Sequence, residues 1–192
     1  MNRLSAVRSK LRRSRRKGST HRLLFLDFDG VVNVPYDYDS PEFQEMEEKG
    51  EYDFFRPELV ARVNRLCRDY GLSVVITSSW RYSGLDYCID SLMRAGFDPA
   101  IEIEGMTDTD DPLFRREEEI FAYLMKTEAV SSFLILDDIP MEEFRDYAVA
   151  TPFYSGYDEE SDLQARKILD RQNHEKDPLW LEVKDEILRL FG

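Results

Sequence analysis

Short apolar runs alternate with amphipathic segments along the chain. The apolar runs have the length and composition of buried parallel strands, and they lie at residues 23–26, 72–76, 100–104, 133–136 and 147–150. The amphipathic segments carry their apolar residues on one helical face, and they lie at residues 57–70, 86–95, 116–126 and 161–169. This alternation predicts an α/β domain in which helices cover both faces of a parallel sheet.

The chain is long enough for one such domain, which we expect at residues 22–172. Residues 173–192 contain Asp177 and Pro178 in the order that begins a helix, and we expect this helix to dock on the domain. The acidic segment at residues 34–55 is too short to be a domain of its own. We therefore expect a minimal cap or none, and an open site.

The charge of the chain is distributed unevenly. Nine of its 26 Lys and Arg residues and none of its 39 Asp and Glu residues lie in residues 1–22, so the rest of the chain carries a net charge of −22. Residues 1–21 are too charged to fold alone, and we expect a flexible basic arm there. Three roles for the arm remain open: binding of nucleic acid through its phosphates, which we favour slightly, targeting to an organelle, and folding back on the acidic body.

The remaining composition indicates an ordinary globular protein of a reducing compartment. No apolar run approaches the roughly 20 residues that span a bilayer, so we expect no membrane segment. Cys67 and Cys88 are the only cysteines and both lie in predicted helices, so we expect buried thiols. A cytoplasmic location follows, unless the basic arm targets an organelle. The sequence does not determine the oligomeric state.

Three of the apolar runs end in polar residues of the kinds that catalysis uses. These pairs are Asp27 and Asp29, Thr77 and Ser78, and Asp137 and Asp138. Because the carboxyl ends of parallel strands lie at one edge of a sheet, we expect the three pairs to converge. Two carboxylates at one strand end repel each other unless a cation lies between them. The pattern therefore indicates a magnesium (Mg2+) site.

The acidic pairs divide into metal ligands and reacting groups. We expect the protein ligands of Mg2+ to be Asp27, the backbone carbonyl of Asp29, and Asp137. Asp138 either holds a metal-bound water or caps the following helix. Asp27 is also the candidate nucleophile, which attacks the phosphorus atom of a phosphorylated substrate and forms an aspartyl-phosphate. Asp29 is the candidate general acid and base.

Further residues are candidates for holding the phosphate. Thr77 and Ser78 are placed to donate hydrogen bonds to its oxygens, although a turn or a helix cap would explain either residue alone. Gly30 allows a sharp turn after Asp29, and we count it among the substrate-binding residues. Arg81 either pairs with the substrate phosphate or forms a surface ion pair.

A cation is also needed to offset the phosphoryl charge. Three basic residues lie in or beside the predicted helix at residues 116–126, between the second and the last of the polar strand ends. We choose Arg116 for this role. Arg115 and Lys126 remain open as alternatives, and a solvated charge at the start of a helix would explain Arg116 nearly as well.

Four segments carry a family resemblance: LDFDGVVN, VVITSSWR, RREEEIFAYL and FLILDDIP, in that order. They resemble the motifs of the haloacid dehalogenase (HAD) superfamily, and within it the subgroup called the HAD domain in Swiss Army Knife RNA repair proteins. The resemblance covers about residues 22–170. It implies a three-layer, doubly wound sheet of order 3-2-1-4-5 with the nucleophile on the central strand. It also implies Mg2+-dependent phosphate transfer.

The resemblance bears on the reaction as well. An aspartate at position 29 favours phosphatase over dehalogenase chemistry, and the subgroup implies removal of phosphate from nucleic-acid ends. Two places depart from the subgroup, because Gly156-Tyr157-Asp158 replaces Gly-Leu-Thr and Ile139 stands where a third acid is frequent. We expect a phosphomonoesterase. The alternative is a non-catalytic HAD-fold protein that binds RNA or serves as a scaffold through its basic arm.

Overall fold

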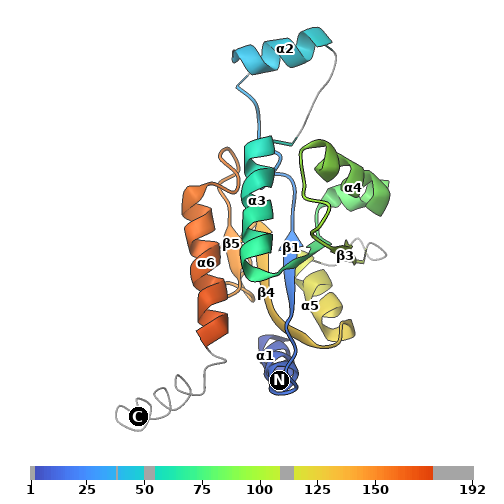
Figure 1. Ribbon diagram of the computed structural model, residues 1–192, viewed down its shortest axis with the longest axis vertical. Helices are drawn as coiled ribbons and strands as arrows, with labels where there is room; N and C mark the ends of the chain where they lie inside the picture. Colours follow the sequence, from blue (N-terminus) through green and yellow to red (C-terminus); the bar gives the residue numbers. More distant parts are fainter. Residues whose placement is uncertain (1–2, 38, 50–54, 109–114, 175–192) are drawn as a thin grey trace.

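A parallel sheet forms the centre of the computed structural model, which describes residues 3–37, 39–49, 55–108 and 115–174. The sheet has five strands in the order β3-β2-β1-β4-β5 (Figure 1). The strands are β1 (His21–Leu26), β2 (Ser73–Ile76), β3 (Ile103–Met106), β4 (Val130–Asp137) and β5 (Ala148–Ala150). The α/β fold and the expected strand order are therefore confirmed, with β1 at the centre.

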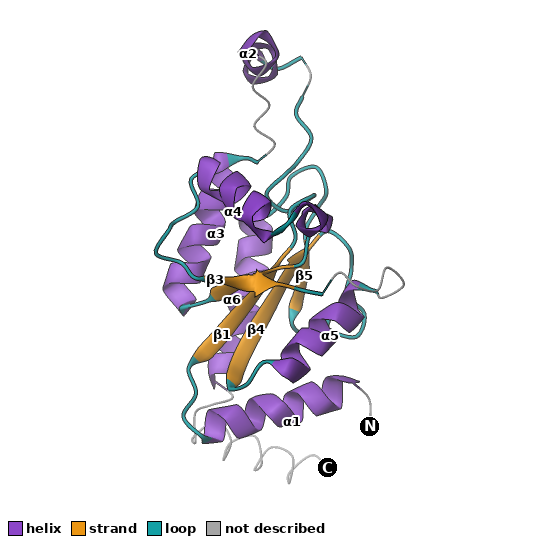
Figure 2. Ribbon diagram, turned by 90° about the vertical axis from the view of Figure 1, so that its right-hand side faces the viewer, coloured by secondary structure: helices purple, strands orange, loops and turns teal. Residues whose placement is uncertain are grey.

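Helices cover both faces of this sheet (Figure 2). The helices of the described residues are α1 (Arg3–Arg16), α2 (Pro41–Lys49), α3 (Pro57–Tyr70), the 3-10 helix η1 (Ser79–Ser83), α4 (Leu85–Arg94), α5 (Arg116–Lys126) and α6 (Glu159–His174), of which α2 stands away from the sheet (Figure 1). Successive side chains of a strand point to opposite faces. Leu24 and Leu26 enter a core with α3, α4 and α6, whereas Leu23 and Phe25 enter a second core with α1 and α5. The apolar run of β1 is continuous because both faces are buried.

Several elements differ in extent from the prediction. β4 begins at Val130 rather than at residue 133, because Ser131 and Ser132 are polar in composition but buried in the sheet. The third strand is β3, shifted from the predicted residues 100–104. The acidic segment, to which the sequence pattern assigns no element, contains α2. The helix expected at residues 173–192 lies outside the described residues, except for the two that end α6.

The flexible basic arm that we expected is a helix in the structure, α1, and the expectation of flexibility is corrected here. Val7 and Leu11 are buried in the second core, against residues of β4 and α5. Arg3 of α1 forms an ion pair with Glu118 at 2.7 Å. A stripe of apolar residues at helical spacing is too small to fold alone, but it folds against an apolar surface that the domain supplies. The segment thus folds back on the acidic body.

The two cysteines agree with the expectation of buried thiols. Cys67 and Cys88 are free and buried, and burial raises the pKa of the Cys67 thiol to about 12. Among the helices that the structure describes, none combines the length and apolar composition that crossing a membrane requires.

Candidate active site

The carboxyl ends of β1, β2 and β4 are flush at one edge of the sheet. Leu26 of β1 pairs in register with Ile76 of β2 and with Leu136 of β4. The next residue of each strand therefore continues the ladder: the Asp27 amide donates to the Leu136 carbonyl at 3.0 Å, and the Thr77 amide donates to the Leu26 carbonyl at 2.9 Å. This register brings the three predicted polar strand ends side by side.

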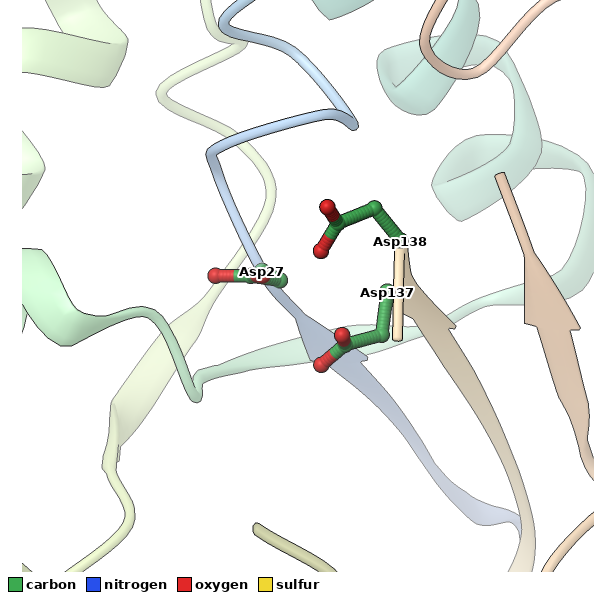
Figure 3. Close-up of side chains that lie close together, drawn as sticks. All are labelled: Asp27, Asp137 and Asp138. Atoms are coloured by element: carbon green, nitrogen blue, oxygen red, sulfur yellow. The ribbon is translucent and has the colours of Figure 1, made fainter. Parts of the chain in front are cut away.

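Three aspartates converge at this edge (Figure 3). Asp27, Asp137 and Asp138 each offer a carboxylate oxygen, and these oxygens lie within 4.8 Å of one another. Asp27 and Asp137 are 3% and 0% exposed. Burial and the neighbouring charge of Asp27 raise the pKa of Asp137 to about 7, and the same two causes raise the pKa of Asp138. Charges that repel one another in this way are stabilised by a divalent cation, and carboxylate oxygens are ligands that Mg2+ prefers.

Arg116 joins the two buried aspartates. Its Nη1 atom lies 2.5 Å from Asp27 Oδ2 and 2.6 Å from Asp137 Oδ2. Although burial lowers the pKa of Arg116, the charges of the two carboxylates raise it above the ordinary value. Of the two alternatives, Arg115 is exposed and the Lys126 side chain is 75% exposed. The geometry therefore selects Arg116 as the cation of the site.

Gly30 makes room for the aspartates. It has a φ of +69°, and a Cβ atom at this position would lie 2.6 Å from Asp138 Cβ. Its amide donates to the Asn33 carbonyl at 2.7 Å, and its carbonyl accepts from Thr151 Oγ1 at 2.7 Å. We expected Gly30 to bind substrate, but its backbone groups are used within the protein. Its contribution is the space that the missing side chain leaves for Asp138.

The side chain of Asp29 is held apart from the aspartate cluster. Asn33 Nδ2 donates to Asp29 Oδ1 at 2.6 Å, and Trp80 Nε1 lies 3.2 and 3.1 Å from its two oxygens. Sequence reasoning missed both donors, since Trp80 reads as an apolar packing residue. Its ring does pack, at 6.0 Å from the ring of Phe28, while its N–H points to the carboxylate. The asparagine four residues after Asp29 was the signal available in the sequence.

Thr77 and Ser78 lie in the buried turn that follows β2. The Thr77 Oγ1 atom is buried and has no hydrogen-bond partner among the described residues. Ser78 Oγ accepts from the Trp80 amide at 3.4 Å and so caps η1. A buried hydroxyl without a partner is costly unless a ligand completes it. Thr77 is thus suited to donate to a phosphate oxygen, whereas part of the role of Ser78 is the cap.

Arg81 forms its ion pair inside the protein, so the alternative of a surface ion pair is wrong. It is 4% exposed, and its Nη2 atom lies 2.7 Å from Glu119 Oε2. Its Nη1 atom donates to the carbonyl oxygens of Thr77 and Ser78. The reason is local, since one turn of 3-10 helix directs the guanidinium back to the carbonyls that precede η1. Arg81 therefore holds the turn that contains Thr77 and Ser78, and its partner Glu119 is a residue that the sequence pattern did not reveal.

Comparison with known proteins supplies one match. The family described as the HAD domain in Swiss Army Knife RNA repair proteins matches residues 23–161. No curated protein and no solved structure matches the chain. The matched range begins in β1 and ends in α6, so it contains every residue of the site described above, whereas α1 lies before it.

Proposed function

Because the chain belongs to the family of HAD domains in Swiss Army Knife RNA repair proteins, we propose that it is a Mg2+-dependent phosphomonoesterase that acts on nucleic-acid ends. Membership of the HAD superfamily suggests a phosphoesterase-like function. The observation that carries the proposal is the joining of Asp27 and Asp137 by Arg116, with a carboxylate oxygen of Asp138 within 4.8 Å of oxygens of both aspartates. This arrangement provides a nucleophile, a metal site and a fixed positive charge together.

The proposed reaction has two halves. A carboxylate oxygen of Asp27 attacks phosphorus, the bond from phosphorus to the ester oxygen breaks, and a protonated Asp29 gives its proton to that leaving oxygen. Asp29 then takes a proton from water, the water oxygen attacks phosphorus, and the bond to Asp27 breaks. Inorganic phosphate leaves and Asp29 is protonated again. When bound by Asp27, Asp137 and Asp138, Mg2+ supplies charge neutralisation at the phosphoryl oxygens.

The surrounding residues orient the reacting groups. Asn33 and Trp80 hold the Asp29 carboxyl in one rotamer, and the Thr77 hydroxyl is available for a phosphoryl oxygen. Arg116 offsets the charge that builds up next to Asp27. The contacts of Asp29 and Arg116 already exist without substrate, and preorganised groups of this kind accelerate a reaction.

Exposed aromatic side chains in segments that follow the strand ends support a nucleic-acid end as substrate. Tyr82 follows β2 and Tyr154 follows β5, and they are 62% and 80% exposed. The loop of Tyr154 lies beside the loop that follows β1, because the Tyr157 amide donates to the Val31 carbonyl at 2.8 Å. Unstacked bases bind exposed aromatic rings such as these, whatever the sequence of the nucleic acid. In Figure 1, helix α2 stands beyond the carboxyl ends of the strands and away from the sheet.

A phosphatase assay tests the proposal. The wild-type protein should release phosphate from phosphorylated oligonucleotides and from a small phosphate ester only when Mg2+ is present. Asp27→Asn keeps the shape of the nucleophile and removes its charge, so turnover should fall to background. The alternative is a non-catalytic RNA-binding or scaffold protein. Wild-type protein that releases no phosphate from nucleotides, sugars, peptides or oligonucleotides, yet binds RNA in a salt-sensitive way, would establish that alternative.

A further inference from the structure

The cations of α1, together with Lys17, the residue that follows it, divide into two sets. One set is directed at the domain: Arg8 pairs with Asp146 at 2.8 Å, and Lys10 Nζ donates to the Leu124 carbonyl at 2.8 Å. The other set comprises four exposed residues, Arg12, Arg13, Arg16 and Lys17, which we call the outer basic face. Within the described ranges, no acidic side chain pairs with any of these four. On a body so rich in acids, four neighbouring cations without an acidic partner are unexpected.

The outer basic face offers charge without apolar surface. The apolar residues Val7 and Leu11 are buried in the core, on the side of α1 that faces β4 and α5. Helices that lie in a membrane surface need an apolar face to enter the lipid, and α1 has used its own. Arginine guanidinium groups bind phosphate through paired hydrogen bonds. The face is therefore complementary to a phosphate polyanion in water.

Hollows flank this face on both sides. One, of about 220 Å3, is lined by Arg8, Arg12 and Arg171 together with Asp146, which pairs with Arg8. The other, of about 720 Å3, is lined by Arg13, Lys17 and Lys126 together with Glu128. Basic residues therefore outnumber acidic ones in both hollows. A sugar-phosphate backbone that crosses the outer basic face would meet net positive charge on both sides of it.

The outer basic face lies far from the active site. Figure 2 shows α1 below the sheet, at the end opposite the carboxyl ends of the strands. The eight residues of β4 lie between the two places, and at about 3.3 Å per residue they span roughly 25 Å. A strand that rises about 3.4 Å per nucleotide along its axis, as in a duplex, covers this distance with about eight nucleotides.

We propose that the outer basic face of α1 is a second contact surface for the nucleic acid whose phosphorylated end enters the active site. This inference takes its substrate from the proposed function. Binding of nucleic acid to α1, however, can be tested without phosphatase activity. Since the acidic body repels phosphates elsewhere, the basic helix is the surface on which the distal part of a long strand can be held. Short strands reach the active site without reaching α1.

Binding of phosphorylated RNA by the full chain tests this surface. The test variant carries Arg12→Gln, Arg13→Gln and Arg16→Gln, which keep good helix formers at exposed positions. A control variant carries Arg65→Gln, Arg94→Gln and Lys167→Gln, which remove the same charge from exposed positions of other helices. Affinities for a 20-nucleotide and a 4-nucleotide RNA are measured by fluorescence anisotropy over a range of salt concentrations, and circular dichroism checks the fold.

The test variant should bind the long RNA on the order of tenfold more weakly than the control variant, with a shallower salt dependence by about 0.7 per lost phosphate contact. The short RNA should bind all three proteins alike. If both variants bind the long RNA equally more weakly than the wild type, or if neither does, the proposal is overturned. It is also overturned if the test variant keeps its affinity for RNA and loses binding only to vesicles of anionic lipid. Turnover of a small phosphate ester is measured alongside, so a failed phosphatase assay is distinguished from a failed contact surface.

Discussion

Arg81 and Glu119 form a buried ion pair with 2.7 Å between Arg81 Nη2 and Glu119 Oε2. Glu119 lies three residues after Arg116 on α5, so one helix carries both the cation of the aspartate pair and the partner of Arg81. Thr107 Oγ1 donates to the same carboxylate oxygen at 3.2 Å. Burial raises the pKa of Glu119, and the charge of Arg81 opposes this shift. Helix α5 therefore ties the turn after β2 to the ends of β1 and β4.

Removing one member of this pair should destabilise the fold strongly. Glu119→Leu leaves the Arg81 guanidinium buried without its counter-charge, and we expect a loss of about 3–5 kcal/mol in the free energy of unfolding. The double variant Arg81→Leu/Glu119→Leu should lose less than the sum of the two single losses. Urea denaturation measures these values. Arg68→Gln, which breaks an exposed pair with Asp98, is the control and should cost less than about 1 kcal/mol. Additive losses in the double variant would contradict the coupling.

The hydrogen bond from Trp80 to Asp29 should matter to the rate more than to binding. Trp80→Phe keeps an aromatic ring in the cluster with Phe28 and removes the N–H that contacts both carboxylate oxygens. A hydrogen bond to a charged group contributes about 1.5–3 kcal/mol, so kcat should fall about ten- to 100-fold with little change in KM. Steady-state kinetics on a small phosphate ester measure both. Tyr87→Phe, next to Trp80, is the matched control. An unchanged kcat in Trp80→Phe would show that Asp29 needs no such positioning.

Magnesium should stabilise the folded protein through the aspartate cluster. A ligand that binds only the native state adds about 2.7 kcal/mol at 100 times its dissociation constant. Saturating MgCl2 should therefore raise the melting temperature of the wild-type protein, and choline chloride at equal ionic strength should not. Asp137→Asn removes one carboxylate from the cluster, so the shift should be smaller or absent. Differential scanning fluorimetry checks this without any substrate. An equal shift in both proteins would place the ion elsewhere.

The capping of α6 should give a pH-dependent contribution to stability. Asp158 Oδ1 accepts from the Ser161 amide at 2.9 Å, and although desolvation raises the pKa of Asp158, hydrogen bonds from Ser161 and Ser155 hold it below its ordinary value. The charged form is thus favoured in the folded state. Asp158→Ala should cost about 1 kcal/mol at neutral pH. This difference should shrink as the pH falls below the ordinary aspartate pKa and through the lowered one.

Denaturation at pH 7 and at pH 3 measures the two limits. Asp158→Asn retains an acceptor for the Ser161 amide and has no charge to titrate, so its cost should be smaller. That cost should change less between the two pH values than the cost of the alanine variant. A constant gap between wild type and Asp158→Ala at both pH values would show that the cap does not depend on the charge.

The convergence of Asp27, Asp137 and Asp138 could be predicted from sequence because each residue follows a local pattern, whereas their roles as nucleophile and metal ligands stay predictions. A buried strand that ends in Asp27 or Asp137 places that carboxylate at the edge of the sheet, and parallel pairing aligns the strand ends. The selection of Arg116 over Arg115 and Lys126 could be proposed from their position but not decided. It depends on which side of α5 faces the strand ends, and this follows from the packing of the whole helix.

What the sequence by itself determined is therefore the fold class and the polar residues at the strand ends, because apolar runs and the residues that follow them act within a few positions of the chain. Only the tertiary structure turned Arg81 inward to Glu119, a residue 38 positions away. It also converted the basic arm into α1, whose apolar stripe folds only against a surface built from β4 and α5. Such partners are chosen by packing between distant segments, which composition and spacing do not encode.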